Sequence, residues 1–151
     1  MNLDPTCNTD DETVAEIVDV SDDGMTLVYT DSEMKKLGFI DISDPSTPEP
    51  AGTVDLVGEP TSVAVLGNYA LVGINTSEDY VNTSGSLVAI DMTTKIVVKS
   101  WDLGGQPDSV AVSPDNKYVV IAIENERDED LGDGKPPQVS KLNLIIPNST
   151  R

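Results

Sequence analysis

The chain has 151 residues, a formal net charge of −18 and no histidine; 38% of its residues are hydrophobic and 4% are aromatic. The charge excludes nucleic acid and anionic membrane surfaces as partners, because both are bound by clustered lysine and arginine. The lack of histidine excludes Ser–His–Asp and Cys–His catalysis and most zinc sites. Any chemistry must therefore use carboxylates, hydroxyls, lysine, arginine or a bound metal.

Residues 1–15 form an N-terminal segment ahead of the first predicted strand. They hold the single cysteine, Cys7, which excludes an internal disulfide framework. This segment lacks the basic start and the apolar core of a signal peptide. The whole chain lacks an apolar run of about 18 residues, so we expect no membrane span.

The first group of predicted strands lies between residues 16 and 56. Its four runs are rich in Val, Ile, Leu and Thr, which suit half-buried strands. They cover residues 16–20, 26–30, 36–41 and 50–56. The connector before the fourth run contains Pro45, Pro48 and Pro50, which favour turns and sheet edges.

The same order of strands occurs twice more. The second group covers residues 62–65, 69–75, 86–91 and 96–102, and the third covers residues 109–112, 118–124 and 141–146. The third group therefore lacks a fourth strand, and residues 147–151 form a tail. We expect Trp101 to pack between two neighbouring sheets.

A sequence repeat accompanies these strands. Gly58-Glu-Pro-Thr-Ser-Val-Ala-Val65 recurs as Gly105-Gln-Pro-Asp-Ser-Val-Ala-Val112, about 47 residues later, and a period of this size is typical of β-propeller blades. The shared Gly-x-Pro-x-Ser element favours a turn over a ligand contact, since glycine, proline and serine each suit turns. The repeat predicts an all-β fold, a partial β-propeller of four-stranded antiparallel blades at about 16–56, 62–102 and 109–146.

Two of these blades are complete and one is incomplete, whereas a propeller usually has four to eight blades. We therefore expect a fragment of a longer protein rather than a subunit that completes its ring with other copies. Open sheets at both ends are expected to make the isolated chain marginally stable or self-associating.

The segment Glu124–Gly134 carries six acidic side chains and one base, Arg127. Calcium takes six to eight oxygen ligands, although the spacing here does not match an EF-hand loop. In an antiparallel blade, residues 59–61, 78–79 and 106–108 should lie at the same end as this segment, where a cation would relieve their repulsion. Two hypotheses stay open, a solvated acidic loop and a calcium site. The predicted ligands of that site are Glu124, Glu126, Asp128, Asp130, Asp133 and Asp108.

Three Asn-x-Ser/Thr sequons begin at Asn75, Asn82 and Asn148. They predict N-glycosylation if the chain passes through a secretory pathway. In a chain this rich in Ser, Thr and Asn, chance matches are the alternative.

The runs Gly105-Gln-Pro-Asp-Ser-Val-Ala-Val-Ser-Pro-Asp-Asn-Lys-Tyr118 and Ile123-Glu-Asn-Glu-Arg-Asp-Glu-Asp-Leu-Gly-Asp-Gly134 resemble the choice-of-anchor I family. This family includes alkaline-phosphatase-like proteins and the mesenchyme-specific cell-surface glycoprotein of echinoderms. The resemblance covers about residues 16–138. It implies a secreted or surface-anchored propeller and, through the echinoderm members, calcium-based biomineralisation.

Three functions follow from these observations. The favoured one is a non-catalytic, acidic, extracellular or cell-surface propeller segment that binds divalent cations, Ca²⁺ first, or a protein or matrix partner. The alternative is a Ca²⁺-dependent phosphoesterase, alkaline-phosphatase-like or phytase-like, using metal-bound water and carboxylates. Such an enzyme needs cationic side chains to hold phosphate, and the chain has nine Lys and Arg in all. The third is a structural repeat without a site.

Overall fold

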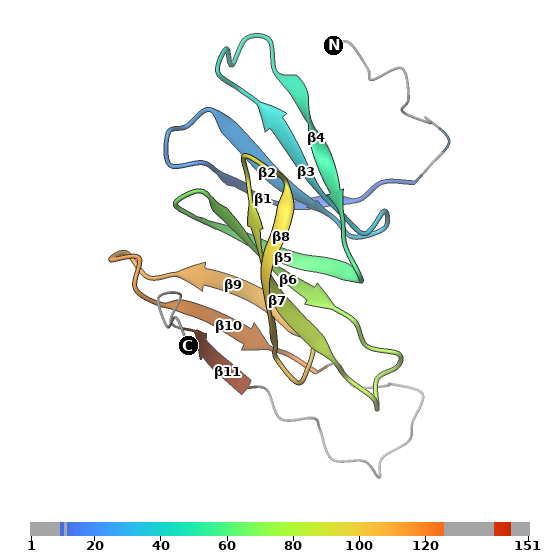
Figure 1. The fold of residues 1–151 in the computed structure, drawn as a ribbon. Helices are drawn as coiled ribbons and strands as arrows, with labels where there is room; N and C mark the ends of the chain where they lie inside the picture. Colours follow the sequence, from blue (N-terminus) through green and yellow to red (C-terminus); the bar gives the residue numbers. More distant parts are fainter. Residues whose placement is uncertain (1–9, 11, 126–140, 146–151) are drawn as a thin grey trace.

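Antiparallel β-strands make up the regular structure of the computed structural model, which describes residues 10, 12–125 and 141–145. No helix occurs in these residues, and so none that is long and apolar enough to cross a bilayer. The strands form three sheets, which we call blades 1, 2 and 3 in chain order (Figure 1). The prediction of an all-β, partial-propeller fold is confirmed.

The order of strands within each sheet follows the order in the chain. Blade 1 consists of β1 (Ala15–Val20), β2 (Thr26–Asp31), β3 (Lys36–Asp41) and β4 (Glu49–Asp55). Blade 2 consists of β5 (Glu59–Leu66), β6 (Tyr69–Asn75), β7 (Gly85–Asp91) and β8 (Ile96–Asp102). Blade 3 has three strands in the described residues, β9 (Pro107–Val112), β10 (Val119–Ile123) and β11 (Lys141–Ile145).

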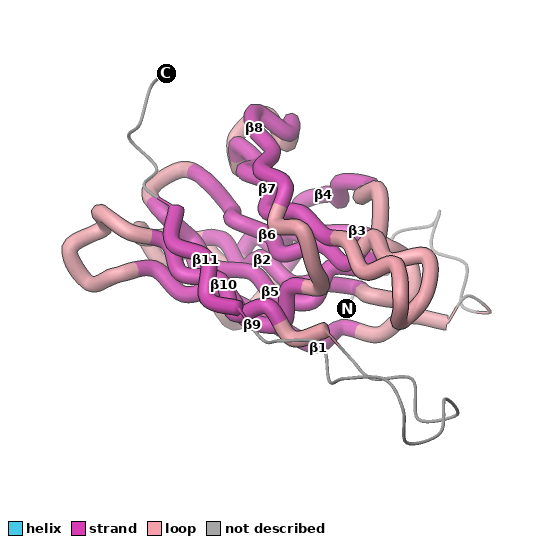
Figure 2. The backbone as a smooth tube through the Cα atoms, turned by 90° about the horizontal axis from the view of Figure 1, so that it is seen from below, coloured by secondary structure: helices cyan, strands magenta, loops and turns pink. Residues whose placement is uncertain are grey.

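The three blades pack face to face, and their first strands lie next to one another. β5 lies between β1 and β9 and contacts both, and the three run side by side in the view of Figure 2. A sheet with both faces covered must be apolar on both. Blade 2 meets this requirement, because alternate residues of β7 enter two different cores: Val88 and Ile90 face blade 1, whereas Leu87 and Ala89 face blade 3.

Each core is built from aliphatic residues of two neighbouring blades. The buried members of the core between blades 1 and 2 are Val28, Leu37, Phe39, Val63, Ala70, Val72, Ile74, Val88 and Ile90. Those of the core between blades 2 and 3 are Ala64, Leu71, Leu87, Ala89, Leu103, Val110, Val119, Ile121 and Ile123. Trp101 packs against the second core, as expected for a residue between sheets.

The predicted starts of two strands are wrong, because the Gly-x-Pro-x-Ser element that was assigned to a turn is partly in the strands. β5 begins at Glu59 and β9 at Pro107, so the prolines lie inside strands rather than in turns. Pro107 is the first residue of its strand, and Pro60 borders an irregularity in the pairing of β5 with β6. Both are positions at which the missing N–H of proline is tolerated. Gly58 is required by crowding, since a Cβ there would clash with the carbonyl oxygen of Asn75.

Candidate functional site

The strand register places one set of loops at a common end of blades 2 and 3. Glu59 pairs with Asn75, Asn75 pairs with Gly85, and Pro107 pairs with Ile123. The start of β5, the loop between β6 and β7, the start of β9 and the end of β10 therefore lie together. We call this end of the blades the loop face. It is the end at which the sequence predicts that the acidic residues gather.

The first residues of the acidic segment are bound to the start of β9. The N–H of Glu124 donates to the carbonyl oxygen of Gln106, and the N–H of Gln106 donates to Oδ1 of Asn125, both at 2.9 Å. Gly105 lies against this contact, because a Cβ there would come within 2.7 Å of Oδ1 of Asn125. The glycine of the second Gly-x-Pro copy thus allows the chain leaving β10 to lie against the entrance of β9.

The loop between β6 and β7 is held by hydroxyl groups. The side chains of Thr76 and Ser84 are 2.9 Å apart, Ser77 Oγ donates to the carbonyl oxygen of Ser84 at 3.0 Å, and the Ser84 N–H donates back at 2.9 Å. Asp79 accepts hydrogen bonds from the N–H groups of Val81 and Asn82. Most of the polar groups of this loop are therefore used in its own folding.

Two of the six predicted metal ligands lie in the described residues. Asp108 and Glu124 are both exposed on the loop face. The described residues contain no group of three or more His, Cys, Asp or Glu arranged to hold a metal ion. The other four predicted ligands, Glu126, Asp128, Asp130 and Asp133, lie outside the described residues.

Acidic residues predominate on the described loop face of blades 2 and 3. Its carboxylates come from Glu59, Glu78, Asp79, Asp102, Asp108 and Glu124. Its described loop segments at 57–61, 75–85, 102–109 and 124–125 contain no Lys or Arg, whereas Lys141, the first residue of β11, pairs with Ile123 at this end. At the same end of blade 1, Lys36 forms an ion pair with Asp55 at 2.9 Å. This contact raises the pKa of Lys36 through a hydrogen bond and the charge of Asp55. Across blades 2 and 3, this acidic surface favours a cation over an anion.

The predicted glycosylation sites differ in their surroundings. Asn82 is exposed in the loop between β6 and β7, where its Nδ2 donates to Asp79 Oδ2 at 3.0 Å. Asn75 is half-buried at the end of β6, and its Oδ1 accepts from the Ser77 N–H at 3.0 Å. Asn148 lies outside the described residues.

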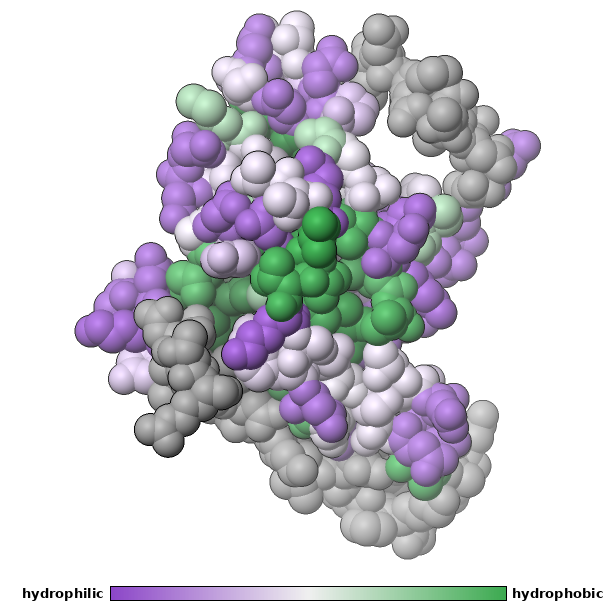
Figure 3. All heavy atoms as spheres, viewed as in Figure 1, coloured by the Kyte–Doolittle hydropathy of each residue, from purple (hydrophilic) through white to green (hydrophobic). Residues whose placement is uncertain are grey.

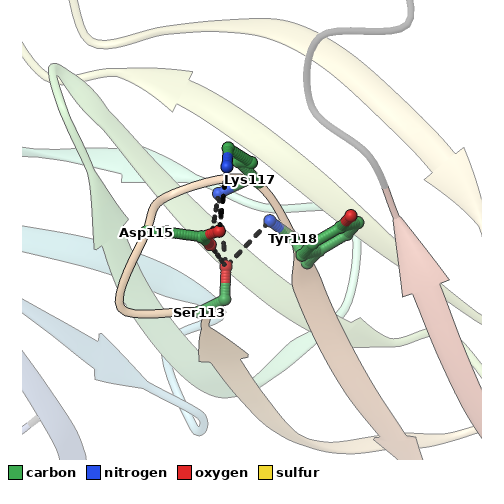
Figure 4. Close-up of polar contacts among 4 residues, drawn as sticks. All are labelled: Ser113, Asp115, Lys117 and Tyr118. Atoms are coloured by element: carbon green, nitrogen blue, oxygen red, sulfur yellow. Dashed lines mark hydrogen bonds and ion pairs between the residues drawn. The ribbon is translucent and has the colours of Figure 1, made fainter.

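The opposite end of the blades carries the short hairpin turns, and we call it the turn face. In blade 3, Ser113 Oγ donates to Asp115 Oδ1 at 2.7 Å and accepts from the N–H groups of Lys117 and Tyr118 (Figure 4). Ser21 and Asp23 make the same contacts in blade 1, with Oγ and Oδ1 at 2.6 Å. The serine hydroxyl lowers the pKa of each aspartate by hydrogen bonding to its charged form.

A polar groove on the turn face was not found from the sequence. It has a volume of about 410 Å³ and lies between the β1–β2 turn of blade 1 and two turns of blade 2. Its lining residues are Ser21, Asp22, Asp23, Thr26, Gly67, Asn68, Met92, Thr93 and Lys95. Lys95 reaches across the blades, and its Nζ lies 5.3 Å from the ring centre of Phe39. Lys95 ends the turn between β7 and β8 at a positive φ of 57°, a left-handed conformation that is uncommon for lysine.

The family of the chain is decided by a match to the choice-of-anchor I domain, which spans residues 16–140. The chain belongs to this family. The resemblance inferred from the two sequence runs is thereby confirmed, and at a coarse level membership points to the cell surface or the extracellular space. Among curated proteins, Antigen Lp49 of Leptospira interrogans serogroup Icterohaemorrhagiae serovar copenhageni (strain Fiocruz L1-130) is 47% identical over 38 residues. That match covers 25% of this chain and 8% of the antigen.

Solved structures support the fold of this choice-of-anchor I domain. Hydrazine synthase of Kuenenia stuttgartiensis superposes with a TM-score of 0.67 at 18% identity, over 87% of this chain and 34% of that chain. A functionally unknown protein from Desulfotomaculum acetoxidans DSM 771 gives 0.59 at 12% identity, over 72% of this chain and 33% of that chain. The chain thus spans about a third of each structure, and these likenesses concern the fold alone.

Proposed function

We propose that this choice-of-anchor I domain is a non-catalytic propeller segment of an extracellular or cell-surface protein, and that its loop face binds a divalent cation, Ca²⁺ first. The proposed ligands are Glu124, Glu126, Asp128, Asp130, Asp133 and Asp108. Calcium suits this set because it prefers carboxylate and carbonyl oxygens and accepts irregular coordination.

One observation carries the proposal. Glu124 and Asn125, the first residues of the acidic segment, are hydrogen-bonded to Gln106. Gln106 directly precedes β9 and is two residues before Asp108 in the chain. Carboxylates from two separate parts of the chain are thereby brought to one end of the blades. Asp108 and Glu124 are exposed, so a cation can reach them.

Carboxylates far outnumber Lys and Arg on the described loop face of blades 2 and 3, which favours a binding role over phosphoester hydrolysis. A phosphoesterase uses cationic side chains to hold the substrate phosphate. The same acidic surface would repel a phosphorylated substrate unless metal ions neutralised it. A cation-binding module needs no such groups.

Isothermal titration calorimetry with CaCl₂ tests the proposal directly. The wild-type chain is compared with a variant carrying Asp128→Asn and Asp130→Asn. The matched control carries Asp22→Asn and Glu49→Gln, which remove two charges from the turn face at exposed positions. We expect saturable binding in the wild type and the control and at least a tenfold weaker affinity in the loop variant. Equal binding by both variants would mean that Ca²⁺ responds to net charge, and the proposed site would be rejected.

A further inference from the structure

The polar groove of the turn face lies between blades 1 and 2, each of which has four strands. One wall comes from the β1–β2 turn, and the other comes from the β5–β6 and β7–β8 turns. The first two of these turns lie at the left of Figure 1, and hydrophilic side chains gather there in the same view in Figure 3. The volume of about 410 Å³ is within the range of about 300–1,000 Å³ that is usual for small-molecule sites. The groove is thus large enough for a small ligand, and it involves neither outer face of the stack.

The β7–β8 wall of the groove carries a cation without an anionic partner. Lys95 is half-buried, and its ammonium makes no ion pair in the part of the chain that the structure describes. The chain has 27 acidic residues and nine basic ones, so acidic residues are not scarce. Partial burial removes water from an ammonium, and a charge in this position is stabilised by a partner of opposite sign. The groove therefore offers Lys95 to an incoming carboxylate.

Contacts with both blades hold Lys95 in position. Its Nζ lies 5.3 Å from the ring centre of Phe39 in blade 1. Its stem passes Gly52 of β4, where a Cβ would come within 3.4 Å of Lys95 Cε. In blade 2, Asp91 Oδ1 accepts from the N–H of Thr93 at 3.0 Å, and the Asp91 carbonyl accepts from the N–H of Lys95 at 2.7 Å. A cation that is positioned before the ligand arrives loses little conformational freedom on binding.

The β1–β2 turn supplies two carboxylates to the opposite wall. Asp22 is exposed, and within the described residues its carboxylate has no hydrogen-bond or ion-pair partner. Asp23 Oδ1 accepts from Ser21 Oγ at 2.6 Å and from the Met25 N–H at 3.0 Å. These hydrogen bonds, that of Ser21 first, lower the pKa of Asp23 and keep it ionised at neutral pH. The groove thus has negative charge on its blade 1 wall and positive charge on its blade 2 wall.

We propose that this groove binds a ligand that carries both a cationic side chain and a carboxylate, as the carboxy-terminal arginine or lysine of a peptide does. The cationic side chain lies against Asp22 and Asp23, and the carboxylate lies against Lys95. Arginine suits the site better than lysine, because a guanidinium can form two parallel hydrogen bonds with one carboxylate. A free basic amino acid has the same two groups, but its α-ammonium would lie near Lys95 and be repelled.

Other small ligands match the charges of the groove less well. An inorganic anion such as phosphate would meet two carboxylates and one ammonium, and a metal ion would lie beside the ammonium of Lys95. A neutral sugar would leave Lys95 and Asp22 without partners of opposite charge. Separate positive and negative groups on one ligand satisfy both walls.

Isothermal titration calorimetry with Nα-acetyl-L-arginine tests the proposal. A chelator in the buffer keeps the result independent of the proposed cation site. Two further probes each lack one charge: Nα-acetyl-L-arginine amide has no carboxylate, and Nα-acetyl-L-citrulline has no guanidinium. We expect saturable binding of acetyl-arginine and about tenfold weaker binding of each analogue, since a hydrogen bond to a charged group is worth roughly that much in affinity. General attraction to a chain of charge −18 would instead favour the positively charged amide over the neutral acetyl-arginine.

Four variants connect the two walls to the two ends of the ligand. Lys95→Met keeps an unbranched stem and should bind acetyl-arginine and its amide alike. Asp22→Asn should reduce the preference for acetyl-arginine over acetyl-citrulline. The matched controls are Lys99→Met, whose Nζ lies 5.0 Å from the Trp101 ring outside the groove, and Glu16→Gln, at an exposed position of β1. Both controls should keep the wild-type preferences. A ratio of two affinities within one variant does not depend on how much of the protein is folded.

Free L-arginine distinguishes the two sources of this ligand chemistry. Weaker binding than that of acetyl-arginine assigns the site to a peptide end, and tighter binding assigns it to the free amino acid. Three results would each overturn the proposal: no saturable binding of acetyl-arginine by the wild type, tighter binding of the amide, or a Lys95→Met variant that still prefers acetyl-arginine to the amide.

Discussion

The Asp19 carboxylate of β1 accepts a hydrogen bond from the backbone N–H of Val65 in β5 at 2.7 Å. Its second oxygen accepts from the N–H of Val20 at 2.8 Å. The residues aligned with Asp19 in the other blades are Ala64 and Ala111, so this contact is specific to the junction of blades 1 and 2. It joins the inner strands of two blades in addition to their aliphatic core.

Replacing Asp19 with Ala should lower the free energy of unfolding by about 1–3 kcal/mol, because the N–H of Val65 loses a charged acceptor. Asp19→Asn keeps a neutral acceptor and should cost less. Urea unfolding at neutral pH measures both, with exposed Asp22→Asn as the control. An unchanged midpoint for Asp19→Ala would show that the bond does not stabilise the junction of the blades.

The strand β7 supports two separate cores. Leu87→Ala and Ile90→Ala each remove a fully buried side chain, one from each face of blade 2. We expect each to cost about 2–5 kcal/mol through lost burial and a residual cavity. Val98→Ala, at an exposed position of β8, should stay within about 0.5 kcal/mol of the wild type. If Leu87→Ala changed the free energy of unfolding little while Ile90→Ala lowered it strongly, blade 3 would not be packed on blade 2 as described.

Acid should weaken the serine–aspartate turns. Asp23 and Asp115 have a pKa below the usual value because Ser21 and Ser113 donate to them. Their stabilisation is therefore present above the unfolded pKa of about 3.9 and is lost as the pH falls through the lower folded value. The variant Ser21→Ala with Ser113→Ala should be less stable than the wild type at pH 7, and the difference should shrink under acid.

Denaturant unfolding across pH measures this effect, with exposed Ser100→Ala as the control. Each serine hydroxyl also accepts hydrogen bonds from backbone N–H groups, and the double variant loses these as well. That part of its loss of stability does not depend on pH. A stability difference that is the same at every pH would contradict the role assigned to the two carboxylates.

Asn82 should be modified before Asn75 when the chain passes through a glycosylating secretory pathway. Asn82 is exposed in a loop, whereas Asn75 is half-buried at a strand end, where its side-chain oxygen accepts a hydrogen bond from the Ser77 N–H. Asn82→Gln should therefore remove the main glycan and Asn75→Gln should have little effect. Mass spectrometry of the intact protein from such a host distinguishes the two. A glycan on Asn75 alone would show that accessibility in the folded chain does not decide the site.

The sequence predicts the strands well because each strand is short, aliphatic and bounded by turn residues. It is misled at Pro60 and Pro107, since proline is generally excluded from strands and only the pairing irregularity and the strand start make it acceptable there. The gathering of Glu59, Asp108 and Glu124 at one end follows from alternating strand direction, so the sequence could predict it. The distances between carboxylates depend on loop conformation, which local composition does not specify.

The groove and the inter-blade contacts could not be predicted. Lys95 adopts a left-handed conformation that lysine does not favour, and it then reaches Phe39 of another blade. Ser62 belongs to the Gly-x-Pro-x-Ser element, which the sequence assigns to a turn, yet its hydroxyl accepts a hydrogen bond from Val110 in the next blade. Both features arise from how the blades stack, which local sequence patterns do not encode.

The most direct test of the central claim, a cation on the loop face, is the thermal unfolding of the chain in CaCl₂ and in NaCl at the same ionic strength. A ligand that binds only the folded state raises its stability by mass action, about 2.7 kcal/mol at a hundred times the Kd. We predict a higher Tm in CaCl₂ than in NaCl, and loss of most of that gain with Asp128→Asn and Asp130→Asn. Equal melting temperatures in the two salts would mean that screening of the net charge explains the whole effect, and the cation-binding claim would be contradicted.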